Sequence, residues 1–66
     1  MKATAKNIAK VLETINSIKN EDNMFSTDVL SEKYGEGVWE VLDELENNGS
    51  IEFTEDIDAE FDGIVK

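Results

Sequence analysis

The side chains that could do chemistry in this chain are almost all carboxylates. Its 66 residues hold 16 Asp and Glu against six Lys, with no Arg, His or Cys, and the formal net charge is −10. These absences remove the usual general base, the usual thiol nucleophile and the bidentate phosphate clamp. Two carboxylates can serve as acid and base, but no pair is singled out, and the serines have no histidine to activate them. We therefore expect no enzyme activity and no cofactor.

One segment matches part of a metal-binding motif. Asp58, Glu60 and Asp62, with Gly63 after them, occupy the first ligand positions and the glycine position of a calcium loop. The glutamate that closes the motif falls beyond the last residue of the sequence. The alternation of apolar and acidic residues over 57–62 explains the same carboxylates as the outer face of a β-strand. We therefore expect a strand here and no bound metal.

The charges are divided unequally along the sequence. Residues 1–20 carry four Lys and one Glu, a net 4 − 1 = +3, whereas residues 21–66 carry two Lys and fifteen Asp or Glu, a net 2 − 15 = −13. A segment this acidic repels phosphate backbones and attracts basic protein surfaces, because its field sums over many charges. The charge division therefore favours a basic macromolecule as the partner.

The elements that must position these charges begin with an amphipathic helix over residues 3–19. Lys2, Lys6 and Lys10 form a basic stripe along one edge of this helix, either as a solvated edge or as a contact for nucleic acid. Apolar residues recur three and four positions apart, which predicts a buried stripe of Ile8, Val11, Leu12, Ile15 and Ile18.

A second, shorter helix is predicted after a polar break at 20–23. Ser26 or Thr27 offers a hydroxyl to cap it, and it runs to Tyr34, where Gly35 ends it. Two apolar residues ahead of the helix are expected to pack against it as a staple. The staple and the inward side chains of the helix are predicted to be Met24, Phe25, Val29, Leu30 and Tyr34.

A third helix is predicted to start near Glu36 or Gly37 and to stop at Asn48 and Gly49, because glycine tolerates the left-handed conformation that closes a helix. Trp39 lies at the border of its apolar stripe, where a large aromatic ring is typical of a core edge. The stripe itself is predicted to contain Val38, Val41 or Leu42, and Leu45.

After the third helix the apolar period changes from helical to alternating, which predicts a β-hairpin. Ile51 and Phe53 lie in the first strand, residues 54–56 form the turn and residues 57–65 form the second strand. The fold class is therefore α+β, with three helices followed by a two-stranded β-hairpin in a single domain over 1–66. The outward side chains of the hairpin are expected to be Glu52, Asp58, Glu60 and Asp62.

Composition indicates a folded protein that is not embedded in a membrane. Hydrophobic residues make up 39% of the chain against 33% charged residues, which is apolar enough to form a core. No apolar run approaches the roughly 20 residues that span a bilayer. We therefore expect a cytoplasmic protein.

The order of these elements resembles the winged helix-turn-helix family, in which two helices joined by a tight turn precede a hairpin called the wing. The resemblance implies a winged-helix-like domain, and the typical member binds DNA through the third helix and the wing. The residues that carry the resemblance are Val29, Leu30, Tyr34, Gly35, Val38, Leu42, Leu45, Gly49 and Ile51.

This sequence departs from the family at the surface that would hold DNA. If the apolar stripe of the third helix faces the core, its outward residues are Glu36, Glu40, Asp43, Glu44 and Asn47. Four of the five are carboxylates, and they would repel a duplex that carries one negative charge per about 1.7 Å. We therefore expect no direct DNA binding through this face or through the acidic wing.

Carboxylates three and four positions apart on a helix lie about 5 to 6 Å from one another, near the spacing of phosphates along a strand. In this respect the chain resembles small phage-encoded inhibitors and DNA-mimic proteins, which implies binding to a basic surface of a nucleic-acid-processing or transcription protein and its inhibition or modulation. The expected partner-binding residues are Glu36, Glu40, Asp43, Glu44, Glu52, Asp58, Glu60, Asp62 and Trp39.

Two other interpretations of the same residues stay open. The acidic face can simply keep a small domain in solution. Alternatively, the chain is a winged-helix interaction module or a transcription-complex subunit with mainly apolar contacts, through Trp39, Phe25 or one face of the first helix. Such a module can be a monomer or a homodimer, and the sequence names neither the partner nor the oligomeric state.

Overall fold

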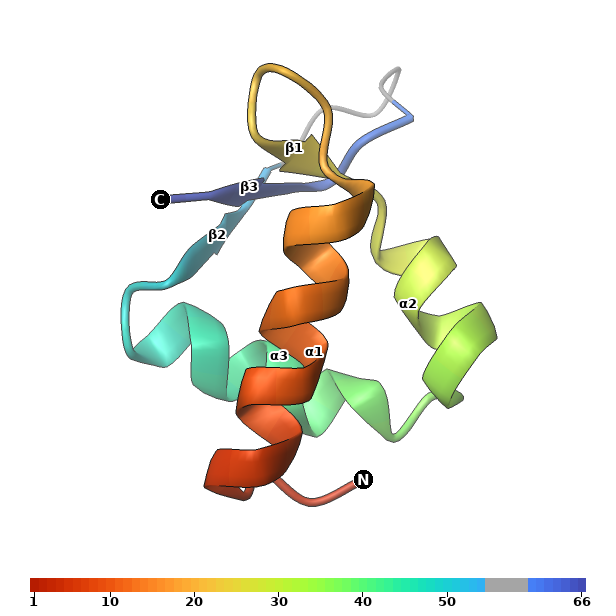
Figure 1. Cartoon of the computed structure of the whole chain (residues 1–66), viewed down its shortest axis with the longest axis vertical. Helices are drawn as coiled ribbons and strands as arrows, with labels where there is room; N and C mark the ends of the chain where they lie inside the picture. The colour runs from red at the N-terminus through yellow and green to blue at the C-terminus, as the bar shows by residue number, and fades with distance from the viewer. Residues whose placement is uncertain (55–59) are drawn as a thin grey trace.

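The computed structural model of the chain describes residues 1–54 and 60–66 and has an α+β fold. Three helices pack together, and a small three-stranded antiparallel sheet covers one end of them (Figure 1). The elements in chain order are α1 (Ala5–Ile18), β1 (Met24–Phe25), α2 (Thr27–Tyr34), α3 (Val38–Asn47), β2 (Ile51–Phe53) and β3 (Gly63–Val65).

Helix α1 confirms the predicted amphipathic pattern. Its N-terminus is capped by Thr4, whose hydroxyl accepts a hydrogen bond of 3.2 Å from the backbone N–H of Asn7. The side chains of Val11 and Ile15 are fully buried. The three other residues of the predicted stripe, Ile8, Leu12 and Ile18, are partly buried and pack against the core.

Helix α2 has the predicted bounds, but one predicted core residue is wrong. Val29 is 44% exposed, whereas Thr27 is only 2% exposed. Leu30 and Tyr34 do face inward, with Leu30 fully buried and Tyr34 partly buried. Val29 is exposed because each residue of a helix is rotated by about 100° from the one before it. Positions 27, 30 and 34 therefore share one face, and Val29 points away from that face.

Helix α3 confirms the predicted buried stripe, because all four of its apolar candidates are fully buried. The glycines predicted to end α2 and α3 both have a left-handed backbone, with φ of 82° at Gly35 and 84° at Gly49. The buried residues of α3 are Val38, Val41, Leu42 and Leu45.

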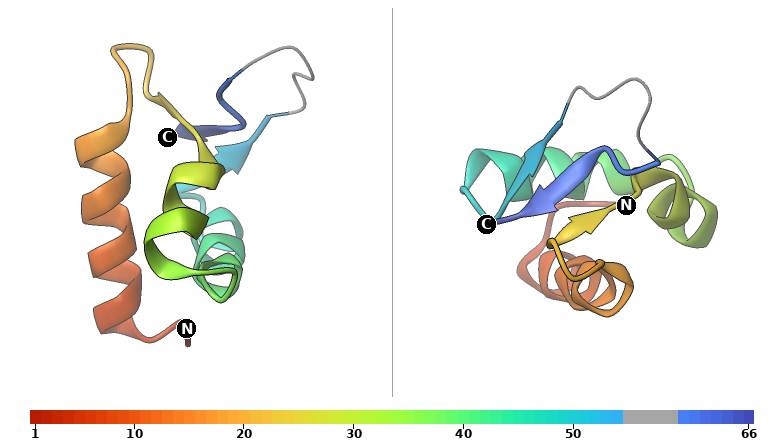
Figure 2. Two further views of the ribbon diagram at one scale, coloured as in Figure 1. Left: turned by 90° about the vertical axis from the view of Figure 1, so that its right-hand side faces the viewer. Right: turned by 90° about the horizontal axis from the view of Figure 1, so that it is seen from above.

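The sheet has one more strand than the predicted hairpin. Its order is β1-β3-β2, with Met24 and Phe25 of β1 paired to Ile64 and Gly63 of β3. The segment expected to be a staple for α2 is therefore an edge strand, and the backbone of Phe25 is fixed by pairing with β3. Because β3 lies between the other two strands, it joins the first half of the chain to the second (Figure 2).

The second strand of the predicted hairpin is shorter than expected. Strand β3 begins only at Gly63, and residues 60–62 are not in a strand. The predicted turn, Asp58 and the start of the predicted strand fall largely in 55–59 and lie outside the described residues. The alternation of apolar and acidic residues over 60–62 does not produce a strand, because the side chain of Asp62 is bonded to Thr27 at the start of α2.

Gly63 allows the sheet to close over the core. It pairs with Phe25 on one side and Phe53 on the other. A Cβ atom at this position would lie 2.4 Å from the ring of Phe25, too close for any real contact. The absence of a side chain at Gly63 therefore makes the space that the fully buried Phe25 ring occupies.

Candidate partner-binding site

The outer surface of α3 and the turn just before it carry the predicted row of carboxylates. Since the four apolar residues of α3 point into the core, the opposite side of the helix is left to solvent. We call the four carboxylates of this surface the acidic face. All four, and the amide at position 47 beside them, are exposed as predicted: Glu36, Glu40, Asp43, Glu44 and Asn47.

The acids of α3 affect the stability of the helix in both directions. Glu40 lies in the first turn, where a negative charge is favoured by the helix dipole. Glu40 and Glu44 are like charges four positions apart, an arrangement that costs about 0.2 to 0.5 kcal/mol per pair in isolated helices. Helix α3 also has no basic residue in its last turn to oppose the dipole, although exposed Glu46 lies there. Local helix stability therefore does not explain the acids that follow the first turn.

One carboxylate of the acidic face already has a partner within the chain. The backbone N–H of Ala3 donates a hydrogen bond of 3.0 Å to Oε2 of Glu40. A Cβ atom at Gly37 would lie 2.4 Å from the backbone nitrogen of Met1, so the first residues pack closely on the start of α3. Glu40 therefore presents less unpaired negative charge than the three other acids of the face.

Trp39 lies at the edge of α3 and is 40% exposed. Its ring centroid is 5.7 Å from that of Phe53 in β2, with 48° between the ring planes, which ties the helix to the sheet. The border position predicted for this residue is confirmed. Phe25, the other aromatic residue considered as a contact, is fully buried, so the expected contact through Phe25 is wrong.

The described carboxylates of the predicted wing differ in their surroundings. Nζ of Lys66 lies 3.1 Å from Oε2 of Glu52, an ion pair in which both side chains are more than half exposed and which therefore adds little stability. Glu60 is exposed, and Asp58 lies outside the described residues.

Asp62 does not point outward from a strand, and that prediction is wrong. Its carboxylate accepts hydrogen bonds of 2.8 Å from the backbone N–H and 2.6 Å from the hydroxyl of Thr27, at the start of α2. Ser26, the N-cap residue, makes no side-chain bond, so Asp62 caps α2 from 35 positions away. The same bonds occupy a carboxylate that the calcium-loop interpretation needed as a ligand.

Searches of protein-family models, curated proteins and solved structures gave no match to this chain. Within residues 1–54 and 60–66, no group of three or more acidic side chains is arranged to hold a metal ion. None of the helices described is long and apolar enough to cross a bilayer.

Proposed function

We propose that this chain is a winged-helix-like protein without catalytic activity that binds a basic surface of another protein through the acidic face. The partner is a nucleic-acid-processing or transcription protein, and binding inhibits or modulates it by occupying the surface that holds a phosphate backbone. The order of three helices and a sheet that closes through β2 and β3 supports the winged-helix part of this proposal.

The observation that carries the proposal is the exposure of Asp43 and Glu44 on the outer side of α3, with exposed Glu36 in the turn just before this helix. In the part of the chain that the structure describes, the single ion pair is Lys66 with Glu52, so none of these three acids is neutralised by a lysine. A row of unpaired charge of one sign steers a partner of the opposite sign and fixes its orientation.

Solubility alone explains the acidic face less well than binding does. Acids scattered over any exposed position would keep the chain in solution equally well. Here three of the four are on α3, Glu40 and Glu44 are spaced so that they repel each other, and the last turn lacks a compensating base. An arrangement that lowers stability locally is expected where a surface serves recognition.

Charge reversal on the acidic face tests the proposal. We expect D43K/E44K to weaken binding of a basic partner at least tenfold at low salt and much less at high salt, because exposed charges are screened. The partner is captured from a lysate on the immobilised chain, identified, and titrated by fluorescence anisotropy at two salt concentrations. Duplex DNA is then added and should compete with the wild-type chain for binding to the captured partner.

The matched control is E21K/D22K, which makes the same change in net charge. Glu21 and Asp22 are exposed in the loop between α1 and β1, at the end of the molecule away from α3 (Figure 1). This control should keep more than half of the wild-type affinity. Equal weakening by both double variants, or a partner that still binds DNA while the chain is bound, would show that the acidic face is not the binding surface.

The exposure of Trp39 favours a second candidate function, an interaction module held mainly by apolar contact. If the chain is such a module, Trp39→Ala should weaken partner binding about tenfold or more at both low and high salt. A large aromatic side chain contributes much of the binding energy of an apolar interface. Val29→Ala, which removes another exposed apolar side chain, is the control and should change affinity less than twofold. A loss that disappears at high salt would exclude this second function.

A further inference from the structure

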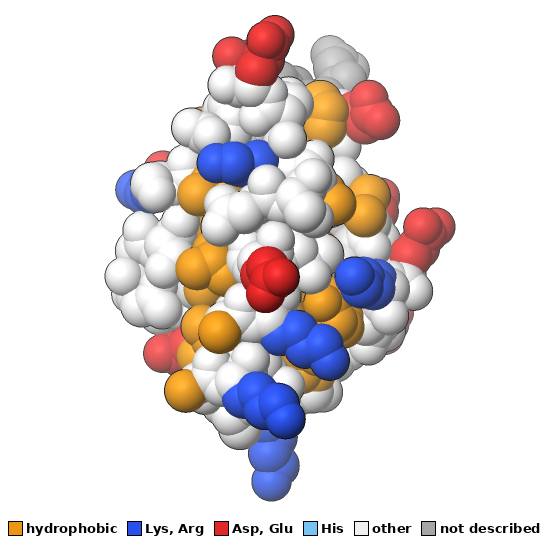
Figure 3. All heavy atoms as spheres, viewed as in Figure 1, with side chains coloured by type: hydrophobic (Ala, Val, Ile, Leu, Met, Phe, Trp, Pro, Cys, Tyr) orange, Lys and Arg blue, Asp and Glu red, His pale blue; other side chains and the backbone are white. Residues whose placement is uncertain are grey.

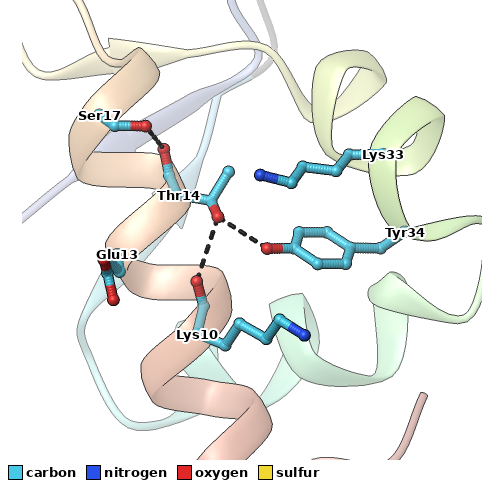
Figure 4. A pocket seen from close by; sticks show the side chains of 6 residues that line it. All are labelled: Lys10, Glu13, Thr14, Ser17, Lys33 and Tyr34. Carbon is cyan, nitrogen blue, oxygen red and sulfur yellow. Dashed lines mark hydrogen bonds between the residues drawn. The ribbon is translucent and has the colours of Figure 1, made fainter.

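A hollow of about 380 Å³ opens between α1 and α2. Figure 4 shows the lysines at positions 10 and 33 extending into it from the two helices, with the ring of Tyr34 between them. In Figure 3, which views the molecule from the α1 side, lysines are spread over this surface and one carboxylate lies near its centre. The six lining residues are Lys10, Glu13, Thr14, Ser17, Lys33 and Tyr34.

The positive charges of the hollow are not neutralised by the described part of the chain. Lys33 places its Nζ 5.6 Å from the centroid of the Tyr34 ring, a cation–π contact that holds the ammonium group near the hollow. The single ion pair in residues 1–54 and 60–66 involves neither Lys33 nor Lys10. Glu13 lines the hollow but lies at the opposite edge of α1 from Lys33 in Figure 4.

A hydroxyl pair gives the hollow a third donor. The oxygens of Thr14 and Tyr34 are 2.7 Å apart, and either can donate. The Thr14 hydroxyl also lies 3.2 Å from the carbonyl oxygen of Lys10, to which it donates. In that arrangement Tyr34 donates to Thr14. If the Thr14 proton turns to Tyr34 instead, the Tyr34 proton becomes available to a ligand in the hollow.

We propose that this hollow binds a phosphate group. A phosphate monoester carries between one and two negative charges and presents three acceptor oxygens, which match two ammonium groups and one phenolic hydroxyl. The lining offers donors and positive charge together, which suits an anion. The proposal is independent of the proposed partner-binding function, because α1 and α2 form the hollow and no residue of the acidic face lines it.

The test is a titration with inorganic phosphate at constant ionic strength, followed by amide chemical shifts in the NMR spectrum. We expect saturable shifts confined to the facing turns of α1 and α2, with a Kd on the order of 1 mM. Lys10→Gln and Lys33→Gln should each raise the Kd about fivefold or more, and Tyr34→Phe about twofold to threefold. Lys19→Gln removes one charge outside the lining and should change the Kd less than twofold.

A mononucleotide and a short single-stranded oligonucleotide distinguish the source of the phosphate. If the phosphate group belongs to a small molecule, the mononucleotide binds at least as tightly as inorganic phosphate, and Lys6→Gln has no effect on the Kd. If a strand carries it, the oligonucleotide binds more tightly than the mononucleotide and Lys6→Gln weakens only that binding. The proposal is overturned if the shifts do not saturate, if they are spread over the whole chain, or if Lys19→Gln weakens binding as much as Lys33→Gln.

Discussion

Gly63→Ala is expected to lower the free energy of unfolding by about 3 kcal/mol, the upper end of the usual penalty for overpacking a core. The added Cβ atom would meet three atoms of the Phe25 ring at 2.4 to 2.8 Å, and that ring is fully buried. A domain of this size has roughly 3 to 10 kcal/mol of stability in total, so the variant should lose between about a third and all of it. Urea unfolding followed by the fluorescence of Trp39, the single tryptophan, measures the loss.

Phe25→Leu provides the control for this prediction. Alone it leaves a cavity and should cost about 1 to 2 kcal/mol. Combined with Gly63→Ala, the smaller side chain makes room for the new methyl group, so the double variant should be more stable than the sum of the two losses by at least about 1 kcal/mol. Additive losses would show that contact with Phe25 is not why glycine is required.

Asp62→Ala is expected to cost about 2 kcal/mol, because it removes both the cap of α2 and the partner of a buried hydroxyl. The Thr27 side chain is 2% exposed, so its hydroxyl would lose its bond without gaining full access to water. The backbone N–H of Asp62 donates to the carbonyl of Phe25 at 3.2 Å, and that bond does not depend on the carboxylate. The change in the midpoint of urea unfolding measures the effect.

Two variants isolate the role of the Asp62 carboxylate. Asp62→Asn keeps an acceptor for the Thr27 N–H and should lose only about 1 kcal/mol. Glu60→Gln removes the negative charge of an exposed side chain two positions before Asp62. It should change stability by less than about 0.5 kcal/mol. If Glu60→Gln is as destabilising as Asp62→Ala, general electrostatics rather than the bond to Thr27 explains the loss.

The sequence predicted the three helices well because the signals that define a helix are local. Apolar spacing and the glycines at 35 and 49 lie within the segments they describe. The exposure of the acidic face followed from the same reasoning, since naming the buried residues of a helix fixes its outer side. Glu46, also exposed on α3, was missed because it lies on the flank and not opposite the core.

The parts that the sequence did not predict depend on contacts between distant residues. Strand β1 has two residues, too few to show an alternating pattern, and it exists because Phe25 pairs with Gly63. Asp62 looked like an outward residue of a strand because its bond to Thr27 crosses 35 positions. The hollow between α1 and α2 likewise combines Lys10 with Lys33, and nothing near either lysine indicates the other.

The central position of β3 also has a consequence for the order in which the chain folds. Glu52 in β2 and Met24 in β1, the two strands that flank β3, both pair with Ile64, at sequence separations of 64 − 52 = 12 and 64 − 24 = 40. Closing the longer loop costs about 1 kcal/mol more in chain entropy, so β2 and β3 should pair first and β1 should join them last. During synthesis, Phe25 leaves the ribosome long before Gly63 does, and its place in the core is completed only when residues 63–65 have followed.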